Sequence, residues 1–137
     1  MGGCASVPDT MAESFLLPTL AQPIRPPLSR DEASAEANRC LFCYDAPCIR
    51  ACPTGIDIPL FIQQIATSNV GGAARTILAS NILGHSCARV CPTEVLCEGA
   101  CVLSDQHRPI QIGPLQGYAT GWALQSGMQI LKPGAPK

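Results

Sequence analysis

The chain has 137 residues and a formal net charge of −1. This length predicts one domain. The charged residues are scattered rather than gathered into the basic patch of a nucleic-acid-binding protein, and no apolar run reaches the ~18 residues of a membrane span. The first residues also lack the pattern of a secretory signal. We therefore expect a cytoplasmic protein that binds neither nucleic acid nor membrane.

Residues 1–28 are expected to form an extended segment, because five prolines interrupt regular structure there. Within it, Cys4 is interpreted as a tail residue. Residues 29–131 are expected to form the ordered domain, and residues 132–137 a linker or tail. The five prolines are Pro8, Pro18, Pro23, Pro26 and Pro27.

The ordered domain is predicted to begin with a helix. Ser29 and Glu32 fit a capping box, and the helix is expected to run through Cys40. The segment from Cys43 to Thr54 is too rich in proline and cysteine for a long helix. We therefore expect no long helix in this segment.

Two helices are predicted in the middle of the chain. Pro59 suits a first helical turn, and four apolar side chains after Asp57 share one helical face. Asn69–Gly72 is expected to break this helix, and a second is expected from Ala73 to Asn81, ended by Gly84. The apolar side chains of the first helix are Ile58, Phe61, Ile62 and Ile65.

A last amphipathic helix is predicted after Pro109. Ile112, Leu115, Ala119 and Trp122 recur at the spacing of one helical face, and Trp122 is expected to anchor the core. No strand pattern is present anywhere in the sequence. The predicted fold class is all-α.

Eight of the nine cysteines form two blocks. The first is Cys40-x2-Cys43-x4-Cys48-x3-Cys52-Pro53, and the second is Cys87-x3-Cys91-Pro92-x4-Cys97-x3-Cys101. Cysteine followed by proline at the end of a short run is typical of ferredoxin-type [4Fe-4S] ligation. The pattern favours iron–sulfur over structural zinc, since only the first two cysteines have the CxxC spacing. An odd count without an export signal disfavours a disulfide scaffold.

The spacing leaves part of the ligand set open. Cys40, Cys43 and Cys48 are expected to bind one cluster and Cys52 the other, as in ferredoxin runs whose last cysteine crosses over. Cys97 and Cys101 are four apart and would point the same way on a helical turn. Either Cys87 completes eight cysteine ligands, or it is a free buried thiol and one ligand is not a cysteine. The candidates are then His85, Gln106, His107, Gln111 and Gln116.

Three stretches together resemble one family. They are RCLFCYDAPCIRACPTGIDIPLFI, LGHSCARVCPTEVLCEGAC and PIQIGPLQGYAT. They are similar to the N-terminal iron–sulfur domain of dihydropyrimidine dehydrogenase, most narrowly to the flavoprotein subunit of the bacterial NAD-dependent enzyme. The likeness covers about residues 29–133, and extends more distantly to the small subunit of glutamate synthase.

The resemblance implies an α-helical ferredoxin with two [4Fe-4S] clusters. Placed on this sequence, the family pattern leaves Cys87 as a cysteine that is not a ligand. It assigns the first cluster to Cys40, Cys43, Cys48 and Cys101, and the second to Cys52, Cys91, Cys97 and Gln116.

The resemblance also implies a function. Electrons from NAD(P)H would pass through FAD on another domain or subunit, through the two clusters, and on to an FMN-containing dihydropyrimidine dehydrogenase-type subunit. There uracil or thymine would be reduced to the 5,6-dihydro form. Self-association as a homodimer is also expected. The chain has no dinucleotide fingerprint or nucleophile elbow, so we expect part of an oxidoreductase rather than a complete active site.

Two alternatives remain at this stage. The first is an electron-transfer domain of a glutamate synthase small-subunit-like oxidoreductase, with the same clusters but another destination for the electrons. The second, of a different class, is a zinc-binding interaction module without redox chemistry. An air-sensitive brown colour would exclude the second.

Overall fold

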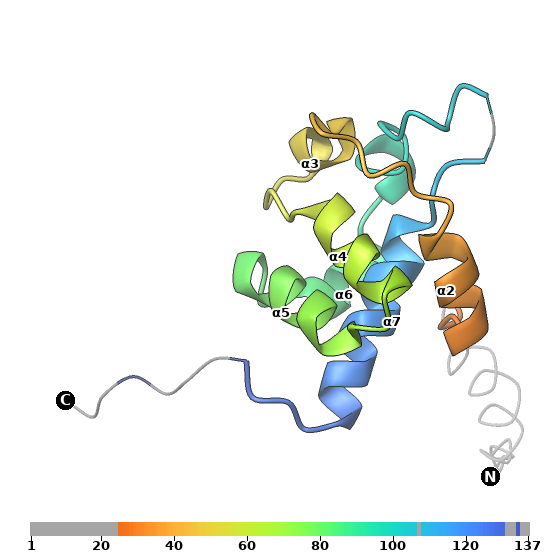
Figure 1. The fold of residues 1–137 in the computed structure, drawn as a ribbon. Helices are drawn as coiled ribbons and strands as arrows, with labels where there is room; N and C mark the ends of the chain where they lie inside the picture. The colour runs from red at the N-terminus through yellow and green to blue at the C-terminus, as the bar shows by residue number, and fades with distance from the viewer. Residues whose placement is uncertain (1–24, 107, 131–133, 135–137) are drawn as a thin grey trace, which may run out of the picture.

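The computed structural model describes residues 25–106, 108–130 and 134. The expectations for the first 24 residues, for His107 and for most of the predicted linker lie outside these residues. The described part is helical and contains no strand, which confirms the all-α class (Figure 1). No helix in this part has the length and apolarity needed to cross a membrane. The helices are α2 (Arg30–Ala37), α3 (Pro47–Ala51), α4 (Ile58–Ala66), α5 (Val70–Ser80), α6 (Gly84–Val90), the 3-10 helix η1 (Thr93–Val95) and α7 (Ile112–Gln125).

Helix α7 runs through the middle of the fold (Figure 1). It contacts α2, α4, α5 and α6, while α4 also packs on α5 and on α2. The core is aliphatic: isoleucines and alanines fill most of it, and Phe61 is the largest fully buried side chain among the described residues. Burial of these apolar side chains is the main force that holds the helices together.

Helix α2 has the predicted capping box but ends early. The Ser29 hydroxyl accepts from the Glu32 backbone N–H, and the Glu32 carboxylate accepts from the Ser29 N–H. The helix ends at Ala37 with Asn38 as its C-cap, so the prediction that it reaches Cys40 is wrong. The Asn38 side chain hydrogen-bonds back to the Ser34 carbonyl, which closes the last turn. Cys40 therefore lies in the loop beyond the helix.

Helix α4 confirms the predicted apolar face, but α5 begins earlier than predicted. All four apolar side chains expected on that face of α4 are buried. Helix α5 starts at Val70 rather than Ala73, because the Asn69 side chain accepts from the Gly72 N–H and caps the helix. The two glycines that suggested a break lie inside the first turn, where the cap offsets their low helix propensity.

Gly84 begins a helix rather than ending one. A Cβ atom at this position would lie 2.6 Å from the Ile77 side chain, so only glycine allows α6 to pack this closely on α5. Helix α5 instead ends at Ser80, with Asn81 as its C-cap. The Asn81 side chain accepts from the Leu83 N–H and shapes the short turn into α6.

Residues 96–100 form a chain of turns rather than a helix. The 3-10 helix ends at Leu96 with φ −119° and ψ −113°, which no helical residue adopts. A Cβ at Gly99 would lie 2.3 Å from the Glu94 carbonyl oxygen, so glycine is required for this close approach. The expectation that Cys97 and Cys101 point the same way is wrong, because the helical spacing is absent and the two side chains line different cavities.

Helix α7 is buried on more than one face. Ile112, Leu115 and Ala119 are buried as predicted, but so are Gln116 and Thr120. Trp122 is 43% exposed, so the prediction that it anchors the core is wrong. Its ring lies 3.5 Å from the position of a Cβ on Gly71, and it therefore covers the start of α5 from outside.

Candidate metal sites

The first candidate site is a cavity lined by Cys40, Cys43, Cys48 and Cys101. The loop after α2 supplies the first two cysteines, α3 the third, and the end of the turns at 96–100 the fourth. The remaining lining is almost entirely apolar, with Ile58 and Ile62 from α4. The cavity is small, about 30 Å³. Cys48 and Cys101, which are 53 positions apart in the chain, thus line one small and largely apolar pocket.

Burial and repulsion between neighbouring thiolates favour the protonated form of two of these thiols, Cys40 and Cys48. Burial raises the pKa of Cys48 to about 11, and negative charge on Cys40 and Cys101 adds to the shift. Burial likewise raises the pKa of Cys40, with further contributions from Cys101 and Cys43. Thiolates this crowded need a positive centre among them.

The second candidate site is a larger cavity, about 110 Å³ in volume. Five of the candidate ligands named from the sequence line it: Cys52, Cys87, Cys91, Cys97 and Gln116. They come from the end of α3, from α6 and its C-cap, from the turns after η1, and from α7. All but Gln116 are cysteines, and Gln116 is only 7% exposed.

The thiols of the second cavity also influence one another. Burial raises the pKa of Cys97 to about 12, helped by negative charge on Glu98, Cys52 and Cys91. Burial raises the pKa of Cys91 as well, with Cys87 and Cys52 adding to it. No thiol of the first cavity contributes to these shifts, and none of the second contributes in the first. For each of the four thiols whose pKa is raised, the contributing cysteines thus line the same cavity as that thiol.

Cys52 is the exception among the thiols whose pKa is shifted, because its pKa is lowered. Burial acts to raise its pKa, but hydrogen bonds from the Thr54 hydroxyl and from the backbone N–H groups of Ile56, Thr54 and Gly55 together lower it below the usual value. The Thr54 oxygen lies 3.4 Å from the sulfur. The turn after Pro53 thus stabilises negative charge on this sulfur, as hydrogen bonds commonly do around iron–sulfur sites.

The Gln116 amide is held in one orientation. Its nitrogen donates to the Gly84 carbonyl oxygen at 2.6 Å, which leaves the amide oxygen as the atom available to a metal. Of the other non-cysteine candidates, His85 is hydrogen-bonded to Thr120, and neither Gln106 nor Gln111 lines a cysteine cavity. Among the described candidates, Gln116 alone shares a cavity with cysteines.

One side chain lines both cavities. Ile58, at the start of α4, lines both and is 2% exposed. The two cavities therefore lie next to each other and share this buried apolar side chain.

The donor set suits iron–sulfur clusters. Soft thiolates are the usual ligands of such clusters, and the second site adds one neutral oxygen. Within the described residues, no group of three His, Cys, Asp or Glu side chains converges closely enough to hold a single metal ion. The four thiols that line the first cavity match in number the four corners of a [4Fe-4S] cube.

Several supporting residues carry no signal in the sequence. Glu98 accepts from the Gly113 N–H at 2.9 Å and so caps α7 beside the second cavity. Glu36 is buried in α2 and accepts from Arg39, Arg108 and the Gln111 N–H. Because these contacts cross the fold, only the structure reveals them. They fix the loop and the helix start that deliver Gln116.

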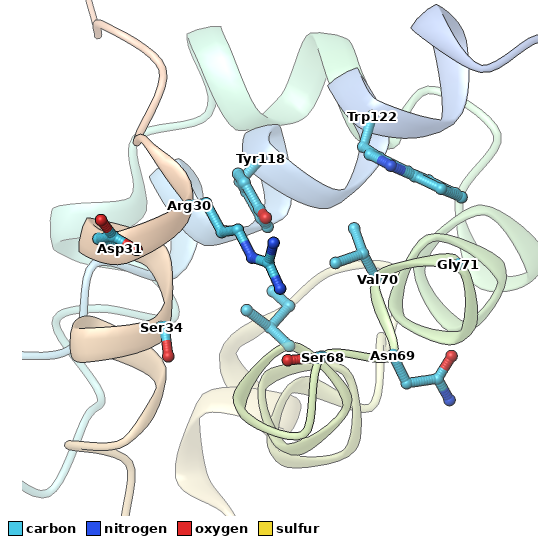
Figure 2. Close-up of a pocket in the computed structure, with 10 residues that line it drawn as sticks. Arg30, Asp31, Ser34, Ser68, Asn69, Val70, Gly71, Tyr118 and Trp122 are labelled. Carbon is cyan, nitrogen blue, oxygen red and sulfur yellow. The ribbon is translucent and has the colours of Figure 1, made fainter.

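A further cavity, about 650 Å³ in volume, lies elsewhere. It opens between α2, the α4–α5 turn and α7, and Figure 2 shows Arg30 reaching into it between Tyr118 and Ser68. No cysteine lines it. It is therefore separate from both candidate metal sites.

The fold and the cysteine cavities define a helical iron–sulfur domain that transfers electrons. Residues 19–128 match the family described as dihydropyrimidine dehydrogenase domain II, 4Fe-4S cluster. The chain belongs to this family, and the match confirms the resemblance and the binding of a [4Fe-4S] cluster.

Individual relatives agree with this family. The NAD-dependent dihydropyrimidine dehydrogenase subunit PreT of Escherichia coli K12 is 50% identical over 102 residues, which cover 74% of this chain and 25% of the relative. PreT of Salmonella typhimurium is 50% identical over 103 residues, 75% of this chain and 25% of the relative. The putative oxidoreductase AegA of E. coli K12 is 36% identical over 102 residues, which cover 74% of this chain and 16% of the relative. The chain spans about a quarter or less of the length of these relatives.

Proposed function

We propose that the chain holds two [4Fe-4S] clusters and relays single electrons between an NAD(P)H- and FAD-binding domain or subunit and an FMN-containing subunit of the dihydropyrimidine dehydrogenase type. The final reaction would be reduction of uracil or thymine to the 5,6-dihydropyrimidine. In this proposal Cys40, Cys43, Cys48 and Cys101 bind the first cluster, and Cys52, Cys91, Cys97 and Gln116 bind the second.

The observation that carries the proposal is the division of the donors into two cavities. All four ligands proposed for one cluster line the same cavity, and no proposed ligand lines both cavities. Two neighbouring centres that share one buried isoleucine suit one-electron transfer over a short path. The relatives named as dihydropyrimidine dehydrogenase subunits support the choice of pathway.

The side chains of this protein have defined tasks in the proposal. When bound, each cluster supplies one-electron redox chemistry. The protein binds it, excludes water with Ile58 and its aliphatic neighbours, and sets the charge around it. Thr54 and the following N–H groups stabilise negative charge on Cys52, whereas Gln116 contributes no charge at its corner.

A chimera would test the pathway. The matched segment of E. coli PreT would be replaced by that of this chain, and the enzyme assembled with its remaining components under anaerobic conditions. We expect NADH to reduce the clusters and uracil to reoxidise them, with Cys101→Ser as the inactive control. Reduction by NADH without reoxidation by uracil or thymine would contradict the proposed substrate.

A second candidate keeps the domain but changes the destination of the electrons. The 36% identity to the putative oxidoreductase AegA shows that related sequence occurs in a protein not named for pyrimidines. A glutamate synthase small-subunit-like oxidoreductase is the form of this candidate that the sequence favours. In the chimera it would leave the clusters reducible by NADH but unresponsive to pyrimidines.

A further inference from the structure

Five candidate ligands line the second cavity, one more than a [4Fe-4S] cluster needs. Cys87 lines it together with Cys52, Cys91, Cys97 and Gln116. A cube has four corners, so the proposed ligand set leaves this thiol without a corner. The first cavity has no such excess: four cysteines line it, and no other thiol does.

Cys87 lies between two of the proposed corners. Gly84, Cys87 and the C-cap Cys91 follow one another at a spacing of three and four residues, so they form one stripe along α6. Gln116 is anchored to the Gly84 carbonyl oxygen. A helical carbonyl points toward the residue four positions on, which brings the Gln116 amide beside the turn that carries Cys87.

The Cys87 sulfur is held in place by Asn81. The Asn81 amide nitrogen donates to this sulfur at 3.2 Å, and its oxygen accepts from the Leu83 N–H at 3.0 Å. Asn81 also lines the cavity. The amide is therefore fixed at both ends and keeps the thiol at the cavity wall.

We propose that Cys87 is a reserve ligand for the corner of the second cluster that Gln116 holds. This inference rests on the proposed ligand set. Sulfur is a softer donor than an amide oxygen and is preferred by iron in such clusters. Gln116 holds the corner because its amide is fixed by Gly84, and Cys87 takes the corner when the amide is removed. The exchange would add one negative charge, and the reduction potential of the second cluster would fall.

Four forms of the full chain test this proposal: wild type, Gln116→Ala, Cys87→Ser and the double variant. Each would be loaded anaerobically with ferrous iron and sulfide, and the iron content, EPR spectra and reduction potentials measured. Serine keeps an acceptor for Asn81 but removes the soft sulfur. Gln125→Ala, an exposed glutamine of α7, and Cys4→Ser are the matched controls.

We expect both single variants to retain about eight iron per chain, the content of two cubes. Gln116→Ala should lower the potential of the second cluster, and Cys87→Ser should leave it unchanged. The double variant should lose iron from the second site while the signals of the first site persist. Gln116→Cys combined with Cys87→Ser should restore the iron, which shows that this background still folds.

Three results would overturn the proposal, and they have different consequences for the ligand set. If Gln116→Ala alone loses as much iron as the double variant, Cys87 is no reserve ligand but Gln116 remains a ligand. If Cys87→Ser alone loses iron, Cys87 is the resident ligand and the assignment of Gln116 fails. If all four forms keep both clusters at unchanged potentials, neither residue is a ligand.

Discussion

The two cysteine-lined cavities are built differently. Loops and the five-residue helix α3 supply the four thiols of the first, whereas α6 and the central helix α7 contribute to the second. The first is small and lined only by thiols and apolar groups at its proposed corners. The second is larger and contains a fifth donor and an anchored amide. We infer that the four proposed ligands of the first site are all thiolates with the same charge. In the second site, the charge depends on whether the amide or the fifth donor binds.

The turns between Cys97 and Cys101 connect the two sites, and the largest effect is expected there. In Gly99→Ala the new Cβ would lie 2.3 Å from the Glu94 carbonyl oxygen, and backbone atoms cannot move away as a side chain would. We expect iron content to fall at both sites. Gly121→Ala is the control, because its Cβ meets no atom closer than 3.6 Å. Normal loading of Gly99→Ala would show that the loop is adaptable.

Removal of one proposed ligand from each site should affect only that site. We expect Cys101→Ser and Cys97→Ser each to keep about half the iron, with different EPR signals surviving, since each cube binds four iron. Cys4→Ser should retain the full iron content. Loss of the same signal in both variants would mean that the two cysteines serve one cluster, as their spacing alone first suggested.

Ile58, which lines both cavities, can be shortened without changing a proposed ligand. Ile58→Ala would leave a void in a fully buried position, and such substitutions cost about 2–5 kcal/mol. Chemical unfolding of the loaded protein would measure the loss, with Ile82→Ala, 65% exposed, as the control. Equal stability of the two variants would contradict the role of Ile58 as a packed wall.

The metal-free chain should lose stability as the pH rises. The pKa of Cys48 is about 11 and that of Cys97 about 12 in the folded chain, above the usual 9.0, because burial disfavours the thiolates. This contribution is fully present below pH 9.0 and is lost as the pH rises from there through the two folded values. Urea unfolding across this range would detect it, and Cys48→Ser with Cys97→Ser should flatten the dependence. Constant stability would contradict the shifts.

The smallest expected effect is on the potential of the second cluster. Gln116→Cys would replace a neutral ligand with an anionic one, and charge alone predicts a lower reduction potential. A redox titration beside the wild type would measure the difference, while Gln125→Cys controls for an added thiol. An upward shift would contradict the charge argument.

Patterns that depend on neighbours in the chain predicted much of the fold. The capping box at Ser29, the position of Pro59 and the apolar face of α4 all follow from local spacing and are found in the structure. Spacing failed where a distant contact decides the outcome. Position 84 requires glycine because a Cβ there would lie 2.6 Å from the Ile77 side chain of α5, and Glu36 is buried because α2 meets the loop before α7.

For the candidate sites too, local patterns predicted one part and distant contacts decided the other. The cysteine blocks identified the chemistry, because Cys-Pro runs are typical of [4Fe-4S] proteins. Spacing did not separate Cys97 from Cys101, since the turns at 96–100 depend on one close backbone contact at Gly99. It also left several candidates beside Gln116, whose position depends on the packing of α6 against α7.

The most direct test of two clusters in two separate sites is the iron and acid-labile sulfide content of the anaerobically purified chain, with Mössbauer spectra of the same sample. We predict about eight iron and eight sulfide per chain, all in [4Fe-4S] centres. About four iron and four sulfide, or zinc without sulfide, would contradict the two-site assignment, and Gln116 would be the first ligand to withdraw.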